Sequence, residues 1–198
     1  MQSSGNCETP KIRAFIGIEV TNLGWIGDLR EALTAESLPG AQKLRLTPDS
    51  NLHLTLKFLG TVNSAAIPEL SLHLGQVCAK HAPFVLACSG LGHFKQLIWA
   101  GLNEDPALVR LAKDIETCCS LLGYASEEKS FKPHITVARY GKAAQPPLQK
   151  LQDKYAEQDW FTQTVNEICL YQSETLSSGA KYSVLDRFAL NQEKHKQE

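Results

Sequence analysis

Two histidine–threonine pairs with the same spacing are the residues of this chain best suited to chemistry. His53 and Thr55 lie in the stretch SNLHLTLKFLG, and His134 and Thr136 lie in FKPHITVARYG. Imidazole ordinarily has a pKa near neutrality, so two histidines can supply one general base and one general acid. The threonine hydroxyls can donate hydrogen bonds to phosphoryl oxygens. Together the four side chains suit in-line displacement at phosphorus without a metal ion, with one imidazole on each side.

Each pair occurs in an apolar, β-rich run that ends at a glycine, which is typical of a strand. Side chains alternate across a strand, so the histidine and threonine of each pair share one face. The opposite face can pack on helices, whereas the polar face must meet water or a polar ligand. The apolar residues that alternate with the two pairs are Leu52, Leu54, Leu56, Ile135 and Val137.

The two stretches belong to a larger repeat. Aligning His53 with His134 also aligns Thr55 with Thr136, and both runs close at a glycine. Hydrophobic periodicity predicts helices over 23–36, 65–81, 105–123 and 146–158. Strands are predicted over 12–20, 43–48, 51–60, 83–94, 95–102, 131–141, 164–174 and 180–190. We therefore expect a single α+β domain over residues 1–198 with two similar lobes about a pseudo-two-fold axis. Residues 1–10 are predicted as a flexible leader and 191–198 as a polar tail.

Composition narrows the class of protein. The 198 residues include 20 basic and 21 acidic ones, which argues against a large nucleic-acid surface but allows a local basic pocket. No apolar run reaches the roughly 20 residues that span a bilayer, and the polar N-terminus lacks a signal-peptide pattern. The six cysteines have no C-x-x-C or zinc spacing, so reduced, mostly buried thiols are expected. We expect a cytoplasmic monomer that holds no metal and no cofactor.

The chain resembles the two-histidine phosphoesterase superfamily, and within it the RNA 2′,3′-cyclic phosphodiesterases, also called bacterial 2′-5′ RNA ligases. The resemblance runs from IRAFIGIEV through the two histidine stretches and LIWAGL to LYQSETLSSGAKYSVLDRF. It implies a bilobal fold with two antiparallel sheets facing a central groove and helices outside. It also implies hydrolysis of a terminal 2′,3′-cyclic phosphate to a 2′-phosphate, with His53 as proton donor and His134 as proton acceptor. The residues alone do not orient this pair, because acid and base exchange roles when a reaction reverses.

Four further residues are candidates for RNA contact. Arg139 suits a phosphate clamp, although its parity is opposite to that of His134, so a bulge or twist must bring it to the groove. Arg45 and Lys57 could line the RNA path, with a solvated face as the expected role of each. Phe15 could stack on a base, and the core is the expected place for it.

Three functions remain open at this point. The first is metal-independent hydrolysis of RNA ends or nucleoside cyclic phosphates. The second is 2′-5′ ligation of tRNA halves, in which a ribose 5′-hydroxyl replaces water as the nucleophile. The third is a non-catalytic module that binds RNA ends or nucleotides. Hydrolysis is favoured, because water at about 55 M competes with scarce RNA ends unless the groove excludes it.

Overall fold

The computed structural model describes residues 9–35, 44–128, 130–141, 148–177 and 179–191. The strands are β1 (Lys11–Glu19), β2 (Arg45–Leu46), β3 (His53–Asn63), β4 (Phe84–Phe94), β5 (Leu97–Leu102), β6 (His134–Arg139), β7 (Asp159–Val165), β8 (Glu167–Leu176) and β9 (Gly179–Ala189). The helices are α1 (Ile26–Ala35), α2 (Ile67–Cys78), α3 (Pro106–Leu121) and α4 (Leu148–Tyr155). Short 3₁₀ turns, η2 (Asp49–Asn51) and η3 (Ser64–Ala66), precede β3 and α2.

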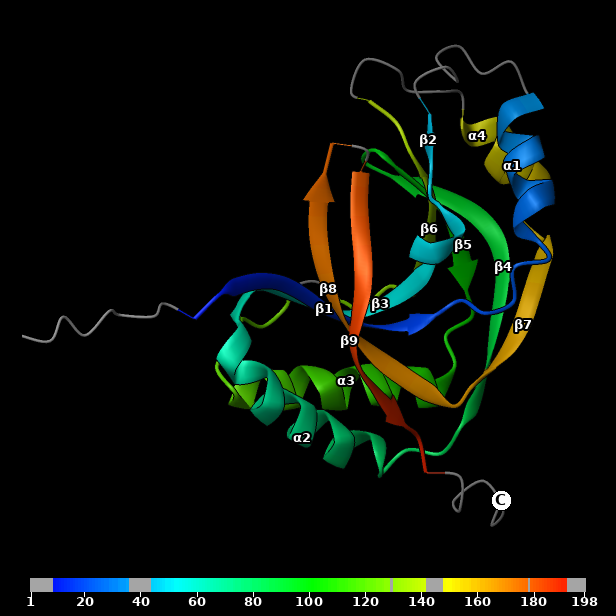
Figure 1. The fold of residues 1–198 in the computed structure, drawn as a ribbon. Coiled ribbons are helices and arrows are strands. Elements are labelled where there is room, and N and C mark those ends of the chain that lie inside the picture. Colours follow the sequence, from blue (N-terminus) through cyan, green and yellow to red (C-terminus); the bar gives the residue numbers. More distant parts are fainter. Residues whose placement is uncertain (1–8, 36–43, 129, 142–147, 178, 192–198) are drawn as a thin grey trace, which may run out of the picture.

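The strands form one curled antiparallel sheet in the order β7-β4-β5-β6-β3-β1-β8-β9, with β2 also pairing to β6 (Figure 1). The order divides into two equivalent halves. We call β3, β1, β8 and β9 the His53 half, and β6, β5, β4 and β7 the His134 half. The expected α+β class with two antiparallel halves is confirmed. The halves are not separate sheets, because β3 and β6 pair at Leu54 and Ile135.

Two helices cover each half on its outer side. Helices α2 and α3 lie together against the His53 half, and α1 and α4 lie together against the His134 half (Figure 1). Helix α3 starts where the sequence predicts: the Asp105 carboxylate accepts from the backbone N–H groups of Ala107 at 2.7 Å and Leu108 at 3.2 Å. Its apolar stripe, including Leu111 and Ile115, is fully buried.

The core is aliphatic and lies between the sheet and the helices. The five cysteines in the described part of the chain are free thiols, as expected, and Cys7 lies outside it. Burial raises the pKa values of Cys78, Cys88 and Cys119 to about 12, which makes these thiols poor nucleophiles.

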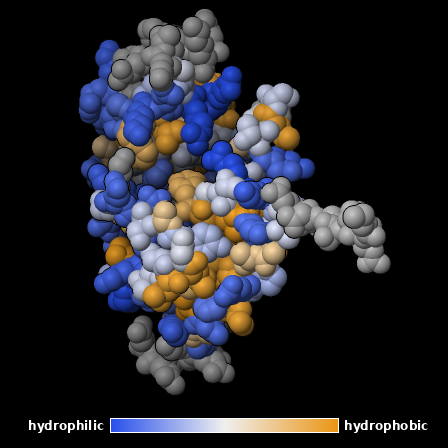
Figure 2. Space-filling view, turned by 90° about the vertical axis from the view of Figure 1, so that its left-hand side faces the viewer, coloured by the Kyte–Doolittle hydropathy of each residue, from blue (hydrophilic) through white to orange (hydrophobic). Residues whose placement is uncertain are grey.

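The face shown in Figure 2 carries both hydrophilic and apolar side chains, and apolar ones gather at mid-height among the hydrophilic ones. Within the described residues, no helix has the length and apolar character needed to cross a bilayer. Most of the predicted leader (residues 1–8) and most of the predicted tail (192–198) lie outside the described residues.

Candidate active site

The paired residues Leu54 and Ile135 organise the site. Both side chains are buried in the core. Because side chains alternate along a strand, the residues on either side of this pair share the opposite face of the sheet. Those residues are His53, Thr55, His134 and Thr136.

The pairing also supplies the expected symmetry. An antiparallel pair has a local two-fold axis, and the axis between Leu54 and Ile135 exchanges one histidine–threonine pair with the other. His53 and His134 each precede their member of this pair and are therefore diagonal neighbours across the two strands. A rise of about 3.4 Å per residue and a strand spacing of about 4.8 Å place the Cα atoms of such neighbours roughly 8 Å apart. This separation lets two imidazoles approach one phosphate group from opposite sides.

Both imidazoles are held in the same way. Nδ1 of His53 lies 2.7 Å from the carbonyl oxygen of Asn51, and Nδ1 of His134 lies 2.8 Å from that of Lys132. A carbonyl oxygen only accepts, so each Nδ1 carries the proton and donates. Each Nε2 is therefore the nitrogen that exchanges protons on the polar face. Nε2 of His53 lies 3.0 Å from the hydroxyl of Thr55, which donates to it when the ring is neutral.

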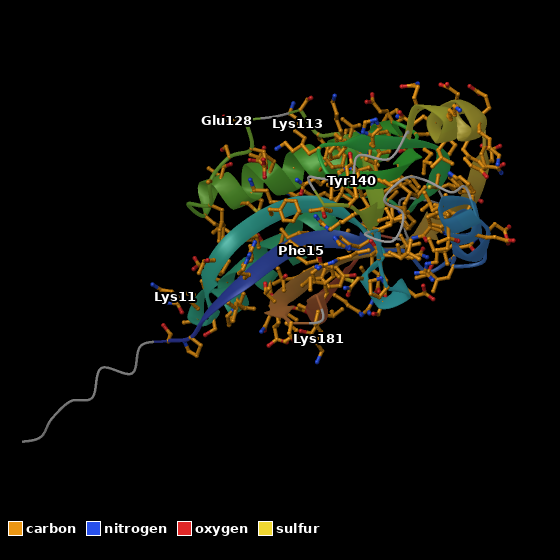
Figure 3. The ribbon with its side chains drawn as sticks, turned by 90° about the horizontal axis from the view of Figure 1, so that it is seen from above. Lys11, Phe15, Lys113, Glu128, Tyr140 and Lys181 are labelled. Carbon is orange, nitrogen blue, oxygen red and sulfur yellow. The ribbon has the colours of Figure 1, made fainter. Side chains whose placement is uncertain are left out.

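Aromatic rings pack around His53. The centroid of its ring lies 4.7 Å from that of Phe15 and 5.1 Å from that of Tyr182, which meets it edge-on. Phe15 also stacks on Tyr171 at 4.8 Å. At 2% exposure Phe15 is a core residue that supports the imidazole, as expected, and Figure 3 shows it on β1.

A different pair of rings borders His134. Phe94 meets its imidazole edge-on at 4.9 Å, and Trp99 lies 6.3 Å away. Sequence reasoning did not single out Phe94 or Trp99. The available signal was their position on either side of the short turn between β4 and β5, which brings two aromatic residues to one end of a hairpin.

The site favours neutral histidines while it holds no anion. Burial lowers the pKa of His53, the backbone hydrogen bond to Asn51 raises it, and the cationic forms of His134 and Arg139 lower it further. Burial and Arg139 lower the pKa of His134, against the hydrogen bond to Lys132. A bound phosphate anion has the opposite effect, because negative charge stabilises an imidazolium.

A bulge in β6 brings Arg139 to the polar face. Trp99 of β5 pairs with Thr136, whereas the preceding residue, Ile98, pairs with Ala138, so Val137 is the extra residue. The bulge reverses the alternation: Val137 and Ala138 are both buried and Arg139 is exposed. The bulge expected from the sequence is therefore present, and it turns Arg139 to the same side of the strand as His134. The electrostatic effect of Arg139 on both histidines agrees with this position.

Arg45 lies directly beside Arg139. The two are paired residues of β2 and β6, and opposite residues of an antiparallel pair project from the same face. Both are exposed. Like charges placed opposite each other repel, so the pair favours an anion between or above the two guanidinium groups.

The expected solvated position of Lys57 is wrong. Its residue is 2% exposed, and Nζ lies 2.8 Å from the carboxylate of Glu116 and 2.5 Å from the carbonyl oxygen of Ala125. The cause is a second bulge: Thr55 pairs with Gly17, whereas Lys57 pairs with Ile16. Alternation is therefore reversed after Leu56, which turns Lys57 into the interior.

Among the described residues, one group of potential metal ligands lies beside His53, because Glu19 of β1 is the paired partner of His53 on β3. Glu19, Glu167 and Cys169 place one ligand atom each within 4.8 Å of the others. Nη1 of Arg187 lies 2.9 Å from the carboxylate of Glu19 and 2.5 Å from that of Glu167, and 3.5 Å from the sulfur of Cys169. The guanidinium of Arg187 thus already pairs with both carboxylates and offsets one of their two negative charges.

The LigT-like phosphoesterase fold accounts for this architecture. The chain superposes on the crystal structure of Escherichia coli LigT complexed with 3′-AMP with a TM-score of 0.72 and 28% identity, covering 92% of this chain and 100% of LigT. The family model of the 2′-5′ RNA ligase superfamily matches residues 23–175, and the chain belongs to that superfamily.

Curated relatives share one activity. The chain is 35% identical over 149 residues to the RNA 2′,3′-cyclic phosphodiesterase of Geobacillus stearothermophilus, a match that covers 72% of this chain and 46% of that relative. It is 29% identical over 186 residues to the RNA 2′,3′-cyclic phosphodiesterase of Aquifex aeolicus, covering 90% and 97% of the two chains.

Proposed function

We propose that this protein is an RNA 2′,3′-cyclic phosphodiesterase, which hydrolyses a terminal 2′,3′-cyclic phosphate to a 2′-phosphate by metal-independent acid–base catalysis. The observation that carries the proposal is the symmetry of the two histidines: the local two-fold axis at the Leu54–Ile135 pair relates His53 to His134. The activity of the curated relatives supports the same reaction. The protein acts as a single bilobal domain, a cytoplasmic monomer that uses no cofactor.

In this mechanism the phosphorus atom sits between the two Nε2 atoms. Nε2 of His134 takes a proton from water as the water oxygen attacks phosphorus, and the bond from phosphorus to O3′ breaks. Nε2 of His53, protonated beforehand, gives its proton to O3′. The phosphate remains on O2′, and the two imidazoles have exchanged protonation states. The negative phosphate of the bound substrate raises the pKa of His53, which supplies the protonated form that the neutral resting site lacks.

Hydroxyl and guanidinium groups stabilise the charge that develops on the non-bridging oxygens. Thr55 and Thr136 lie on the polar face beside the histidines, and each can donate one hydrogen bond. Arg139 reaches that face through the Val137 bulge, and Arg45 stands opposite it. We assign Arg139 to the reacting phosphate, because it acts electrostatically on both imidazoles, and Arg45 to the RNA backbone beyond it.

Product analysis tests the proposal. A short RNA that ends in a 2′,3′-cyclic phosphate is incubated with the protein in the presence and absence of EDTA. We expect a 2′-phosphate end at the same rate in both samples. Absence of this product, or loss of the rate with EDTA, contradicts the proposal.

Ligation is the second candidate, because the same site catalyses it when a 5′-hydroxyl replaces water. Adding an RNA with a free 5′-hydroxyl to the reaction distinguishes the two: a 2′-5′-linked product in preference to the 2′-phosphate assigns ligation. Binding of the RNA end without either product assigns the third, non-catalytic function.

A further inference from the structure

The face of the sheet that carries the ring of His53 continues along β1 well beyond the imidazole. Strand β1 pairs with β8 without a register shift, so alternate residues of β1 project from one face. These residues include Lys11, Arg13, Phe15 and Gly17. The ring of His53 lies over this face, because it packs on Phe15 at 4.7 Å and a Cβ on Gly17 would lie 3.6 Å from it. Figure 3 shows Lys11 near the N-terminal end of β1 and Phe15 midway along the strand.

A row of hydrogen-bond donors crosses this face at Arg13. Arg13 is paired with Thr61 of β3 on one side and with Ser173 of β8 on the other. Ser173 is in turn paired with Tyr182 of β9. Opposite residues of antiparallel strands project from the same face, with Cβ atoms about 4.5–5.5 Å apart. One guanidinium and three hydroxyl groups therefore lie side by side, and we call Thr61, Arg13, Ser173 and Tyr182 the Arg13 row.

The polar groups of the Arg13 row are not used by the fold. Within the described residues, Arg13 makes no ion pair, and none of the four side chains makes a hydrogen bond. Thr61 and Arg13 are exposed, and Ser173 and Tyr182 are half-buried. Donors that are grouped without an acceptor favour an anion. Guanidinium and hydroxyl groups are common ligands of the phosphates of a nucleic acid.

The charges along this face also favour a polyanion. Lys11 is exposed and stands one step of the strand beyond the Arg13 row. No acidic residue pairs with β1 between Lys11 and Phe15. Two carboxylates, Glu19 and Glu167, lie towards the other end of β1, and both are paired with Arg187. The end of β1 that carries the Arg13 row is therefore positive, which suits the phosphates of an RNA strand.

The Arg13 row is too far from the imidazole to contact the reacting phosphate. Arg13 is four residues from Gly17, which lies beneath the ring of His53, and four residues of a strand span about 13 Å. Tyr182 bridges this interval, because its side chain starts in the row and its ring lies 5.1 Å from the ring of His53. An RNA strand that leaves the site over Tyr182 therefore brings a later phosphate to Arg13.

The proposed chemistry decides which part of the RNA lies on this face. His53 gives its proton to O3′, so the ribose of the reacting nucleotide lies on the His53 side of phosphorus. The rest of the RNA is attached to that ribose through its 5′ carbon and starts on the same side. Arg45 and Arg139 stand on the His134 half of the sheet, so the Arg13 row is a separate contact.

We infer that the Arg13 row binds a backbone phosphate of the RNA strand on the 5′ side of the nucleotide that carries the cyclic phosphate. The inference rests on the proposed function and adds to it the partner, which is an RNA strand rather than a mononucleotide. Arg13 supplies the charge, and Thr61 and Ser173 supply hydrogen bonds from either side. Contacts to phosphate carry no sequence information, so the row should hold strands of any sequence.

Substrates of different length test the inference. They are a mononucleotide 2′,3′-cyclic phosphate and short RNAs that end in the same nucleotide and grow at the 5′ end. For the wild type, kcat/KM should increase at the length that brings a phosphate to Arg13. In Arg13→Ala, the ratio of kcat/KM for the longest RNA to that for the mononucleotide should fall roughly 10-fold, the size of a hydrogen bond to a charged group. Thr61→Val should lower the same ratio by a smaller factor.

Lys181→Ala is the matched control. Lys181 directly precedes Tyr182 on β9 and is exposed, but its side chain projects from the opposite face. The control removes an equal charge nearby and should leave the ratio unchanged. Salt dependence of RNA binding gives a second readout, because the loss of one phosphate contact reduces the slope of log K against log salt by about 0.7 for a single strand. Arg13→Ala should show this reduction, and Arg13→Lys and Lys181→Ala should not.

Two results overturn the inference. One is an equal ratio and an equal salt slope in Arg13→Ala and Lys181→Ala, with circular dichroism showing that both variants fold. The other is a loss of the length effect in Arg45→Ala but not in Arg13→Ala, because the strand then leaves over the His134 half. If the wild type hydrolyses neither substrate, the proposed function fails. Fluorescence anisotropy with an RNA that ends in a 2′-phosphate then still tests the Arg13 row, since binding needs no turnover.

Discussion

Leu54 and Ile135 are paired across the junction of β3 and β6, and both side chains are fully enclosed by the core. The pair fixes the relative position of the catalytic candidates, because the neighbours of Leu54 and Ile135 on both strands form the polar face. The position of the two histidines thus depends on strand pairing rather than on loops, which gives the site a rigid base.

The roles of the two histidines should be distinguishable with a substrate whose leaving group needs no proton. We expect His53→Ala and His134→Ala each to reduce turnover of a 2′,3′-cyclic nucleotide about 10²- to 10⁴-fold. With an aryl phosphodiester, whose nitrophenolate leaves without a proton, His53→Ala should recover most of its activity and His134→Ala should not. Steady-state rates measure this, and circular dichroism checks that both variants fold. Recovery in His134→Ala instead would reverse the two roles.

The pH dependence should move when Arg139 is removed. The pKa values of both histidines lie below the ordinary 6.5, so the optimum of kcat/KM should lie on the acidic side of that value. Arg139 contributes to both reductions, and Arg139→Ala should therefore shift the whole profile to higher pH. Arg139→Lys retains the charge and should keep the position of the profile while losing the bidentate phosphate contact. Arg45→Ala is the control, and an equal shift in that variant would contradict the assignment.

The ion pair of Lys57 and Glu116 should respond unequally to the loss of each partner. The Lys57 side chain is 1% exposed and that of Glu116 is 31% exposed. Glu116→Gln leaves a buried cation without its counter-charge and should cost about 3 kcal/mol of unfolding free energy, whereas Lys57→Met leaves a carboxylate that water can reach and should cost less. Urea denaturation gives both values. A larger loss in Lys57→Met would show that packing of the lysine stem outweighs its charge.

Gly17 should be intolerant of a side chain. A Cβ there would lie 2.7 Å from the carbonyl oxygen of Leu54 and 3.6 Å from the ring of His53. Gly17→Ala should therefore push β1 away from β3, reduce stability and lower kcat. Gly27→Ala meets nothing within 4 Å and should instead stabilise the protein by roughly 0.4–1 kcal/mol. Equal melting temperatures and rates for the two variants would contradict this argument.

The sequence predicts the elements and the histidine face well, because both depend on local periodicity. It predicts Lys57 wrongly, because the bulge at Leu56 reverses the alternation and no residue type in that run announces a bulge. It also misses β7 as a separate strand. Asp159–Val165 follows a helix with no glycine or proline between them, and its partner β4 lies some seventy residues away in sequence.

The same limit applies to the surroundings of the site. Arg45 meets Arg139, and Tyr182 meets His53, only through pairings between strands that are remote along the chain. Periodicity contains no information about which strands become neighbours. The resemblance to a known family supplies that information, and the residues alone do not.

The distribution of the chain between the halves has a mechanical consequence. Strand β1 belongs to the His53 half, the next helix covers the His134 half, β3 returns to the His53 half, and α2 is followed by β4 on the other side. In a two-domain enzyme the domains often hinge at one or two linker segments. Here the chain passes several times from one half to the other, and each passage connects the two halves covalently. We therefore expect that neither half folds on its own and that the two halves move little relative to each other when substrate binds.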